Sequence, residues 1–355
     1  MLPNLVVLLL VFLSTLFTLV FINSERESFT KRAVRHVTAR QSSHTAPTPR
    51  VGGIAIAVGI LSGALLSGDD IFGLMLWTTL PIFLIGLVED LGPDTPPTVR
   101  LGVAALSAIL AYMVIGISIE RVDVAWADSL LAVGAVSIAF TVFASVGMTH
   151  AMNLVDGLNG LSSAVVAAIM VAFGAVAYKY GHTDLVVMNA VVCVAFLGFM
   201  CMNFPGGRIF LGDAGAYSVG HMIAWNAIIL LAREPQVSAW GILLILLWPV
   251  LDTLFSMYRR AVAGHAVSRP DRLHFHHLLM RLALLAAPGR LDRDRANPIG
   301  SALAWPLIAI PGIVGYLYID DASGAMWSTL ALAALYIASY RLLVASATKI
   351  RRVVG

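Results

Sequence analysis

The sequence runs through a series of apolar stretches, each about as long as a bilayer is thick. A transmembrane helix needs roughly 20 mostly apolar residues, and eleven stretches approach that length. Charged residues make up 12% of the chain and hydrophobic residues 59%, which excludes an ordinary soluble domain and a disordered chain. We therefore expect one all-α, polytopic integral membrane domain over residues 1–355. The expected spans are 3–22, 51–68, 71–88, 101–118, 129–148, 161–179, 184–202, 215–232, 238–258, 301–319 and 325–345.

The loop charges predict which way the chain crosses the membrane. If the N-terminus lies outside, only Arg121, Lys179 and Arg233 of the 23 Lys and Arg residues fall on the outer side. This asymmetry follows the positive-inside rule. We therefore expect a plasma (inner) membrane protein with its N-terminus outside and its C-terminus in the cytoplasm. The net charge of +3 then reflects orientation, and no nucleic acid partner is required.

The dense polar motifs all fall on the predicted inner side. Five separate loops that meet at one membrane face predict a single cytoplasmic active site. The motifs occupy residues 44–53, 89–90, 153–160, 203–215 and 269–277.

Two adjacent acids, Glu89 and Asp90, end a predicted helix. The negative end of a helix dipole disfavours anions, and acids beside the apolar membrane are costly. We interpret the pair as carboxylates for proton transfer or cation handling. The alternative is the solvated start of a loop.

The residues Asn153, Asp156 and Asn159 are spaced three apart, so on a continuous helix they would share roughly one face. The alternative is that they cap a helix that the intervening glycines break. Asp213 lies between glycines at the start of a span, where it could also be a simple helix cap. Asn153 and Asp213 together offer the hard oxygen ligands that Mg²⁺ prefers.

Three histidines, His274, His276 and His277, lie in the most basic inner loop, beside Arg269 and Arg272. Dense arginine would repel a zinc ion, so we favour a cradle for phosphate or diphosphate over a zinc site or a solvated loop. Asp252 is the chief acid within a span. It is either a structural polar anchor or a further member of the site.

Five ordered segments, PTPRVGG, GLVEDLG, NLVDGLNGL, NFPGGRIFLGDAG and PDRLHFHHLL, resemble the polyprenyl-phosphate N-acetylhexosamine-1-phosphate transferases. The resemblance spans roughly residues 45–280. The interrupted run HFHH is closer to the WecA-type branch than to the MraY-type branch. The resemblance implies that a UDP-linked N-acetylhexosamine donates its sugar 1-phosphate to a polyprenyl (undecaprenyl) phosphate and releases UMP. The product would start a lipid-linked surface polysaccharide. A homodimer is compatible with these features.

The resemblance also implies roles for individual residues. Asn153 and Asp213 correspond to ligands of Mg²⁺, for which Mn²⁺ could substitute, and Glu89 and Asp90 to the catalytic acid pair near the lipid phosphate. The pair is Asp-Asp in the best-known members, and Arg100 is the nearest following cation here. The implied substrate-binding residues are Arg50, Asp156, Asn159, Asn203, His274, His276 and His277.

Three other functions compete with this interpretation. An MraY-type enzyme would take a muramoyl-pentapeptide donor. A transporter or flippase of a phosphorylated solute would place ionisable residues near the bilayer midplane, often with repeat symmetry. A catalytically inactive relative would serve as a scaffold.

Overall fold

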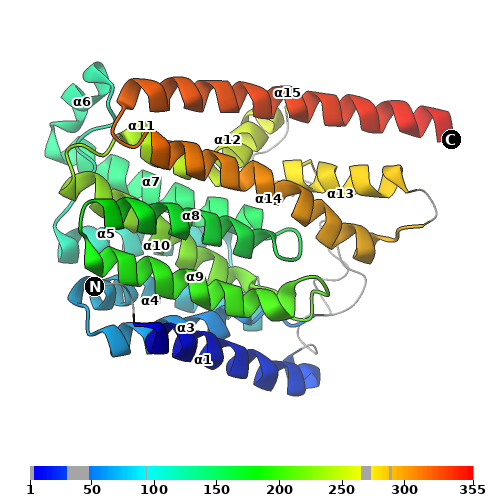
Figure 1. Cartoon of the computed structure of the whole chain (residues 1–355), viewed down its shortest axis with the longest axis horizontal. Helices are drawn as coiled ribbons and strands as arrows, with labels where there is room; N and C mark the ends of the chain where they lie inside the picture. The colour runs from blue at the N-terminus through cyan, green and yellow to red at the C-terminus, as the bar shows by residue number, and fades with distance from the viewer. Residues whose placement is uncertain (1–3, 30–47, 93, 265–272, 288–289, 355) are drawn as a thin grey trace.

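The computed structural model describes residues 4–29, 48–92, 94–264, 273–287 and 290–354. Every regular element in these ranges is a helix, and most lie side by side along the long axis of the molecule (Figure 1). The helices are α1 (Leu5–Ser24), α3 (Gly52–Ser67), α4 (Asp70–Leu91), α5 (Pro97–Ile115), α6 (Ala125–Leu131), α7 (Gly134–Val155), α8 (Leu161–Lys179), α9 (Thr183–Asn203), α10 (Gly212–Arg233), α11 (Ala239–Ile245), α12 (Leu247–Val262), α13 (Phe275–Ala286), α14 (Arg293–Leu317) and α15 (Ala322–Val354).

The prediction of an all-α polytopic membrane protein is confirmed. Among the described residues, nine helices are long and apolar enough to cross a membrane, and the bent pair α11–α12 could make a tenth. The predicted second span forms α3, which has 16 residues and is too short to pass the same test. Gly68 ends α3 in a left-handed conformation with φ 63°.

The ninth predicted span, 238–258, is wrong as a single helix. The chain bends there by 81° between α11 and α12. Pro249 explains the break, because a proline has no amide N–H to donate and its ring clashes with the carbonyl four residues earlier. That carbonyl belongs to Ile245, the last residue of α11.

The basic loop predicted to lie on the inner side also contains a helix that the sequence interpretation did not predict. Residues Phe275–Ala286 form α13, so His276 and His277 lie on a helix and not in a loop. Its buried apolar side chains recur at helical spacing, which lets one face of α13 pack into the bundle. These side chains are Phe275, Leu278, Leu279, Met280 and Ala283.

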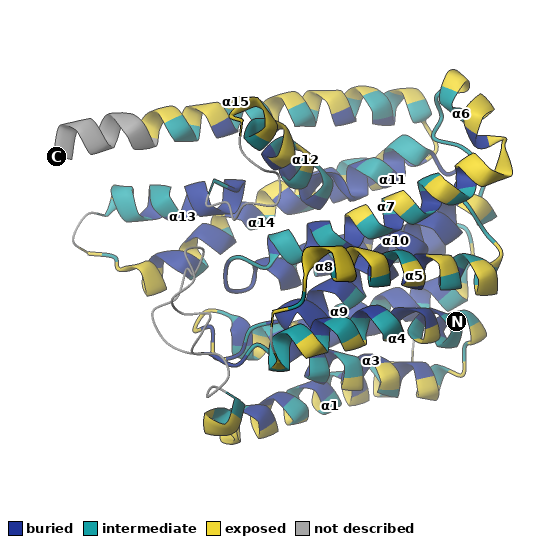
Figure 2. Ribbon diagram, turned by 180° about the vertical axis from the view of Figure 1, so that it is seen from behind, coloured by how far each residue is buried: buried dark blue, intermediate teal, exposed yellow. Residues whose placement is uncertain are grey.

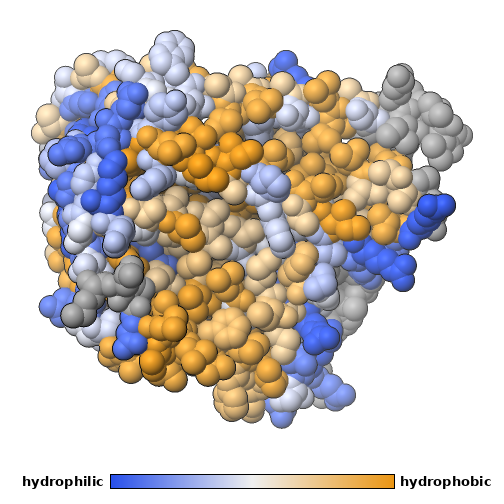
Figure 3. Space-filling model, viewed as in Figure 1, coloured by the Kyte–Doolittle hydropathy of each residue, from blue (hydrophilic) through white to orange (hydrophobic). Residues whose placement is uncertain are grey.

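Helix α10 lies at the centre of the bundle. Over an apolar stretch of 18 residues in each helix, 89% of the residues of α10 are buried, against 22% for α1 and 17% for α15. Figure 2 shows the same contrast, with α10 surrounded by other helices and exposed residues along α1 and α15. Apolar side chains cover the middle of the face in Figure 3, and hydrophilic residues gather toward both ends. This surface suits a bilayer.

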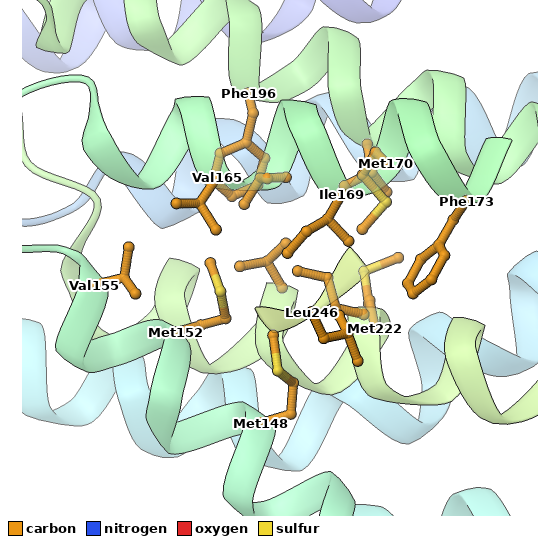
Figure 4. Packing of buried hydrophobic residues seen from close by; sticks show 14 of the residues in the cluster. Met148, Met152, Val155, Val165, Ile169, Met170, Phe173, Phe196, Met222 and Leu246 are labelled. Carbon is orange, nitrogen blue, oxygen red and sulfur yellow. The ribbon is translucent and has the colours of Figure 1, made fainter. Parts of the chain in front are cut away.

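The apolar core joins α10 to the helices around it. Met222 of α10 lies among Met148 and Met152 of α7 and Ile169 of α8 (Figure 4). All four side chains are almost completely buried. Methionine is unbranched and adapts to irregular gaps between crossing helices, so it suits a core that several helices share.

Glycines bring two helices into backbone contact with the start of α10. A Cβ added at Gly53 would lie 2.4 Å from the amide nitrogen of Gly215. A Cβ added at Gly86 would lie 2.5 Å from the Cα and amide nitrogen of Ala214. Small residues allow such close approach between membrane helices. The start of α3 and the end of α4 are thereby held against the first turn of α10.

We expect Gly86→Ala to destabilise the protein by about 1–3 kcal/mol, because the added methyl group overpacks a backbone contact. Gly73→Ala is the matched control, since it lies on the same helix and its added Cβ meets no atom within 4 Å. Thermal midpoints in detergent measure the difference. Equal midpoints for the two variants would contradict the proposed close contact.

Candidate active site

The carboxylate of Asp213 is the centre of a polar cluster at one end of the bundle. Its Oδ1 accepts hydrogen bonds from Arg50 Nη2 at 3.0 Å and from Asn153 Nδ2 at 2.9 Å. Its Oδ2 lies 3.6 Å from Arg100 Nη1 and 3.5 Å from the Tyr217 hydroxyl. The two predicted metal ligands, Asn153 and Asp213, are therefore in direct contact.

Asp90 caps the first turn of α10. Its carboxylate accepts the backbone N–H groups of Asp213 at 2.8 Å and Ala214 at 2.9 Å. The amides at a helix N-terminus lack partners within the helix and carry a positive partial charge, so a carboxylate is favourable there. Gly212 permits this approach: it has φ 75°, and an added Cβ would lie 2.5 Å from Asp90 Oδ2.

Glu89 turns away from its neighbour and faces α5. Its Oε2 accepts the backbone N–H of Thr95 at 2.5 Å, and its Oε1 lies 3.5 Å from Arg100 Nη1. Arg100 therefore lies between Glu89 and Asp213. The adjacent acids Glu89 and Asp90 thus have different environments: Glu89 pairs with Arg100, whereas Asp90 accepts the amides of a helix terminus and has Arg50 Nε 4.0 Å away.

The predicted helical register of Asn153, Asp156 and Asn159 is wrong. Helix α7 ends at Val155, and Gly160 has φ 78°, so the three residues do not share a helix face. Glycine is the residue that adopts such a left-handed conformation without strain. The alternative interpretation, in which glycines break the helix, is the one observed.

Asn159 and Asn203 connect neighbouring loops. The Asn159 amide donates to the carbonyl of Pro205 at 2.8 Å. Asn203 accepts the backbone N–H of Gly160 at 2.6 Å and donates to the carbonyl of Ile209 at 2.9 Å. Both asparagines are buried. In this arrangement their amides shape the loops, and their predicted contacts with substrate stay predictions.

The three histidines lie together at the start of α13. The rings of His274 and His276 stack with their centroids 5.6 Å apart, and the centroid of the His277 ring lies 4.3 Å from that of His276. Burial and the neighbouring His277 hold the pKa of His276 well below its ordinary value, so this ring is neutral near pH 7. It can then bind an anion only through a ring N–H. Arg269 and Arg272, predicted to flank these rings, lie outside the described residues, as do residues 44–47 of the first motif.

The segment 153–157 joins the acid cluster to the histidines. Asn153 bonds to Asp213, and a Cβ added at Gly157 would lie 2.4 Å from His276 Nε2. Glycine at position 157 therefore lets the loop lie directly against the ring. The structure brings most of the predicted site residues into this continuous region, as the five ordered motifs suggested.

Comparison with known proteins agrees with this arrangement. Residues 72–231 match the model of glycosyl transferase family 4. A probable undecaprenyl-phosphate N-acetylglucosaminyl 1-phosphate transferase of Bacillus subtilis is 30% identical over 248 residues, which cover 68% of each chain. The chain belongs to glycosyl transferase family 4.

Two further relatives support the same membership. A decaprenyl-phosphate N-acetylglucosaminephosphotransferase of Mycolicibacterium smegmatis is 29% identical over 67% of this chain and 66% of its own. An undecaprenyl-phosphate alpha-N-acetylglucosaminyl 1-phosphate transferase of Yersinia pestis is 26% identical over 84% of this chain and 82% of its own. The predicted superfamily and the closeness to its WecA-type branch are confirmed.

In this family 4 protein, sequence reasoning missed three side chains that complete the polar network. Arg100 was noted as the nearest cation but was not placed in the site, because ten residues separate it from Asp90. Tyr217 lies one turn beyond Asp213 on α10, a spacing that could have indicated it. Tyr336 on α15 reaches Asp252, and no local motif signals that contact.

Asp156 gives the family 4 protein an expected pH dependence of stability. Burial raises its pKa to about 6 from 3.8, although Ser162 and Arg50 lower it. Between these values the unfolded chain loses a proton that the folded protein retains, so the wild type loses stability as the pH rises. Asp156→Asn removes this titration. We expect the variant to gain stability relative to the wild type from about pH 4 to about pH 6, with a constant difference above that window.

Thermal midpoints of the two proteins in detergent with a chelator measure this difference. Comparing the proteins at each pH cancels the titration of the other acids, which both share. A difference in midpoint that does not change across the window would contradict the raised pKa of Asp156.

Proposed function

We propose that this protein transfers N-acetylglucosamine 1-phosphate from UDP-N-acetylglucosamine to a polyprenyl phosphate and releases UMP. The observation that carries the proposal is the buried Asp213, which binds Asn153 and Arg50 in a chain of family 4. The printed names of its relatives support the sugar phosphate and the polyprenyl phosphate acceptor. The product is the first lipid-linked intermediate of a surface polysaccharide.

In the proposed reaction a phosphate oxygen of the lipid attacks the β-phosphorus of the donor. The bond between this phosphorus and the oxygen that bridges it to UMP breaks, and UMP leaves with that oxygen. The product is a lipid diphosphate sugar. Such phosphoryl transfer depends mostly on positioning the two phosphates and on offsetting their charge. The clustered cationic, acidic and amide groups are suited to both tasks.

We assign the acceptor phosphate to the side of the cluster that contains Glu89 and Arg100. The Arg100 guanidinium can bind phosphate oxygens through charge-assisted hydrogen bonds. Glu89 beside it can engage or deprotonate the lipid phosphate. Both oxygens of Asp90 accept amides of α10, so Asp90 contributes to the proposed acid pair by holding Asp213 in place.

The donor set fits Mg²⁺ held by Asp213 and Asn153. Among the described residues no three His, Cys, Asp or Glu side chains form a metal cluster. Mg²⁺ commonly relies on one or two carboxylates together with waters and substrate phosphates, so this pair fits that mode. Arg50 and Arg100 already contact this carboxylate, so Mg²⁺ would bind in exchange for part of these contacts. When bound, Mg²⁺ or Mn²⁺ would neutralise the donor diphosphate and the departing UMP.

We assign the donor to the region between Arg50 and the histidines. The side chain of Arg50 is 31% exposed, so it can reach a ligand while it remains beside Asp213. Asp156, Asn159 and Asn203 shape or line the loops next to it. The positive-inside distribution of the sequence supports a cytoplasmic face for this region.

A donor panel tests the proposed function. Purified protein with Mg²⁺ and undecaprenyl phosphate should release UMP from UDP-N-acetylglucosamine. The panel includes other UDP-N-acetylhexosamines and the UDP-muramoyl-pentapeptide, which separates the WecA-type reaction from the MraY-type reaction. Folded protein that releases UMP from no donor would overturn the proposal in favour of a transporter or an inactive relative.

We expect Asp213→Asn to lower UMP release roughly 100-fold or more, because Mg²⁺, Arg50 and Arg100 all lose the carboxylate that they contact in the proposed site. Excess Mg²⁺ should not restore the rate. Asp70→Asn is the control, since it changes an exposed acid at the opposite end of α4 from Asp90. A rate for Asp213→Asn close to that of the control would contradict the metal assignment.

We expect Arg100→Gln to raise the KM for polyprenyl phosphate about tenfold or more, since a charge-assisted hydrogen bond contributes about 1.5–3 kcal/mol. The KM for the donor should change much less. Arg341→Gln, on the exposed surface of α15, is the control. If Arg100→Gln raised only the donor KM, the assignment of the acceptor side would be wrong.

A further inference from the structure

Asp252 on α12 is a buried acid that the proposed reaction does not use. Only 2% of its surface is exposed. Its Oδ2 lies 2.7 Å from His274 Nδ1, and its Oδ1 accepts from the Phe275 backbone N–H at 3.1 Å and the Tyr336 hydroxyl at 2.6 Å. One carboxylate therefore joins α12, the start of α13 and α15.

The apolar surroundings of Asp252 would make its carboxylate costly to bury without hydrogen-bond partners. The rings of Trp248, Phe275 and Tyr336 pack edge-on or tilted against one another, with centroid distances from 4.8 to 6.0 Å. A buried charge in apolar surroundings is strongly unfavourable unless it is fully hydrogen-bonded. The three donors satisfy the carboxylate, so its geometry is tightly constrained.

The carboxylate determines which nitrogen of His274 carries a proton. An ionised carboxylate can only accept hydrogen bonds, so the close Nδ1 must donate. The Nε2 atom is then the ring nitrogen available to a ligand. An acid that fixes the tautomer and the ring orientation of a histidine in this way is a recurring device in enzymes.

The same carboxylate also holds the helix that carries the other two histidines. His274 is the residue before α13, and its side chain does not cap the helix. Asp252 accepts the first N–H of α13 in its place. Both ring nitrogens of His276 are buried and have no hydrogen-bond partner among the described residues. A Cβ added at Gly157 would lie 2.4 Å from Nε2, so this ring is packed against the loop of residues 153–157 and its place depends on how α13 is held.

We propose that Asp252, held in place by Tyr336, is a positioning residue for His274 and orients the histidine cluster toward the phosphates of the donor. This inference rests on the proposed function, because it assigns the cluster to the donor. Asp252 acts through His274 and does not itself touch the substrate. The unassigned buried acid of α12 thus becomes part of the site.

Asp252→Asn tests the inference through the separate kinetic constants. We expect kcat/KM for the UDP-sugar to fall about tenfold or more, as for other residues that orient a histidine. The KM for polyprenyl phosphate should stay within about twofold, since Arg100 and Glu89 are unchanged. A rise of the same factor in the KM for polyprenyl phosphate and in the KM for the UDP-sugar would indicate a merely structural role and overturn the inference.

A double variant separates positioning from any other effect of Asp252. If the acid acts through His274, then Asp252→Asn combined with His274→Gln should be no slower than His274→Gln alone. Rate losses of the two single variants that multiply in the double variant would overturn the inference.

Wild-type UMP release is measured first. If the wild type releases no UMP, the proposed function fails; if it does and Asp252→Asn is unimpaired, only this inference fails.

Tyr336→Phe keeps the inference testable if Asp252→Asn does not fold. It removes one hydrogen bond to the carboxylate and retains the ring. The matched control is Tyr340→Phe, one turn along α15, whose hydroxyl donates to the Leu273 carbonyl at 3.0 Å. We expect Tyr336→Phe to lower kcat/KM for the donor by a larger factor than Tyr340→Phe. Equal effects of the two variants would overturn the role of Tyr336.

Discussion

The hydrogen bonds from the first amides of α10 to Asp90 are the interaction on which the rest of the site depends. They fix the start of the most buried helix against the end of α4, and Gly53 and Gly86 bring the neighbouring backbones into contact there. Asp213 is one of the two residues whose amides Asp90 accepts. The cap therefore places the central carboxylate of the site within reach of Asn153, Arg50 and Arg100. A helix dipole and close packing act here on the same few residues.

The site has two parts with different physical characters. The acid cluster around Asp213 is built from charged side chains at helix ends, and its arginines remain partly exposed. The histidine cluster is buried among aromatic rings, and its orientation depends on Asp252. A reaction between two phosphates needs both a place that offsets charge and a place that holds one partner in a fixed direction. The loop at Gly157 joins the two parts.

Much of this architecture could be predicted from the sequence, because apolar length and ordered motifs are local signals. They indicated the helical membrane fold, the family and the polar segments that meet at one end of the bundle. The bend before Pro249, the helix α13 and the end of α7 at Val155 depend on packing or on a single residue within an apolar run. The contacts of Arg100 and Tyr336 join residues that are distant in sequence. No periodic pattern predicts such contacts.

The arginines beside Asp213 have a consequence for how the protein is made. Arg50 and Arg100 act as resident counter-ions for Glu89, Asp90 and Asp213, so most of the local negative charge is offset by the chain itself. The bundle can then insert and pack during synthesis before it meets a dissolved ion, a nucleotide or a lipid phosphate. Ligand capture becomes an exchange of partners within a finished scaffold.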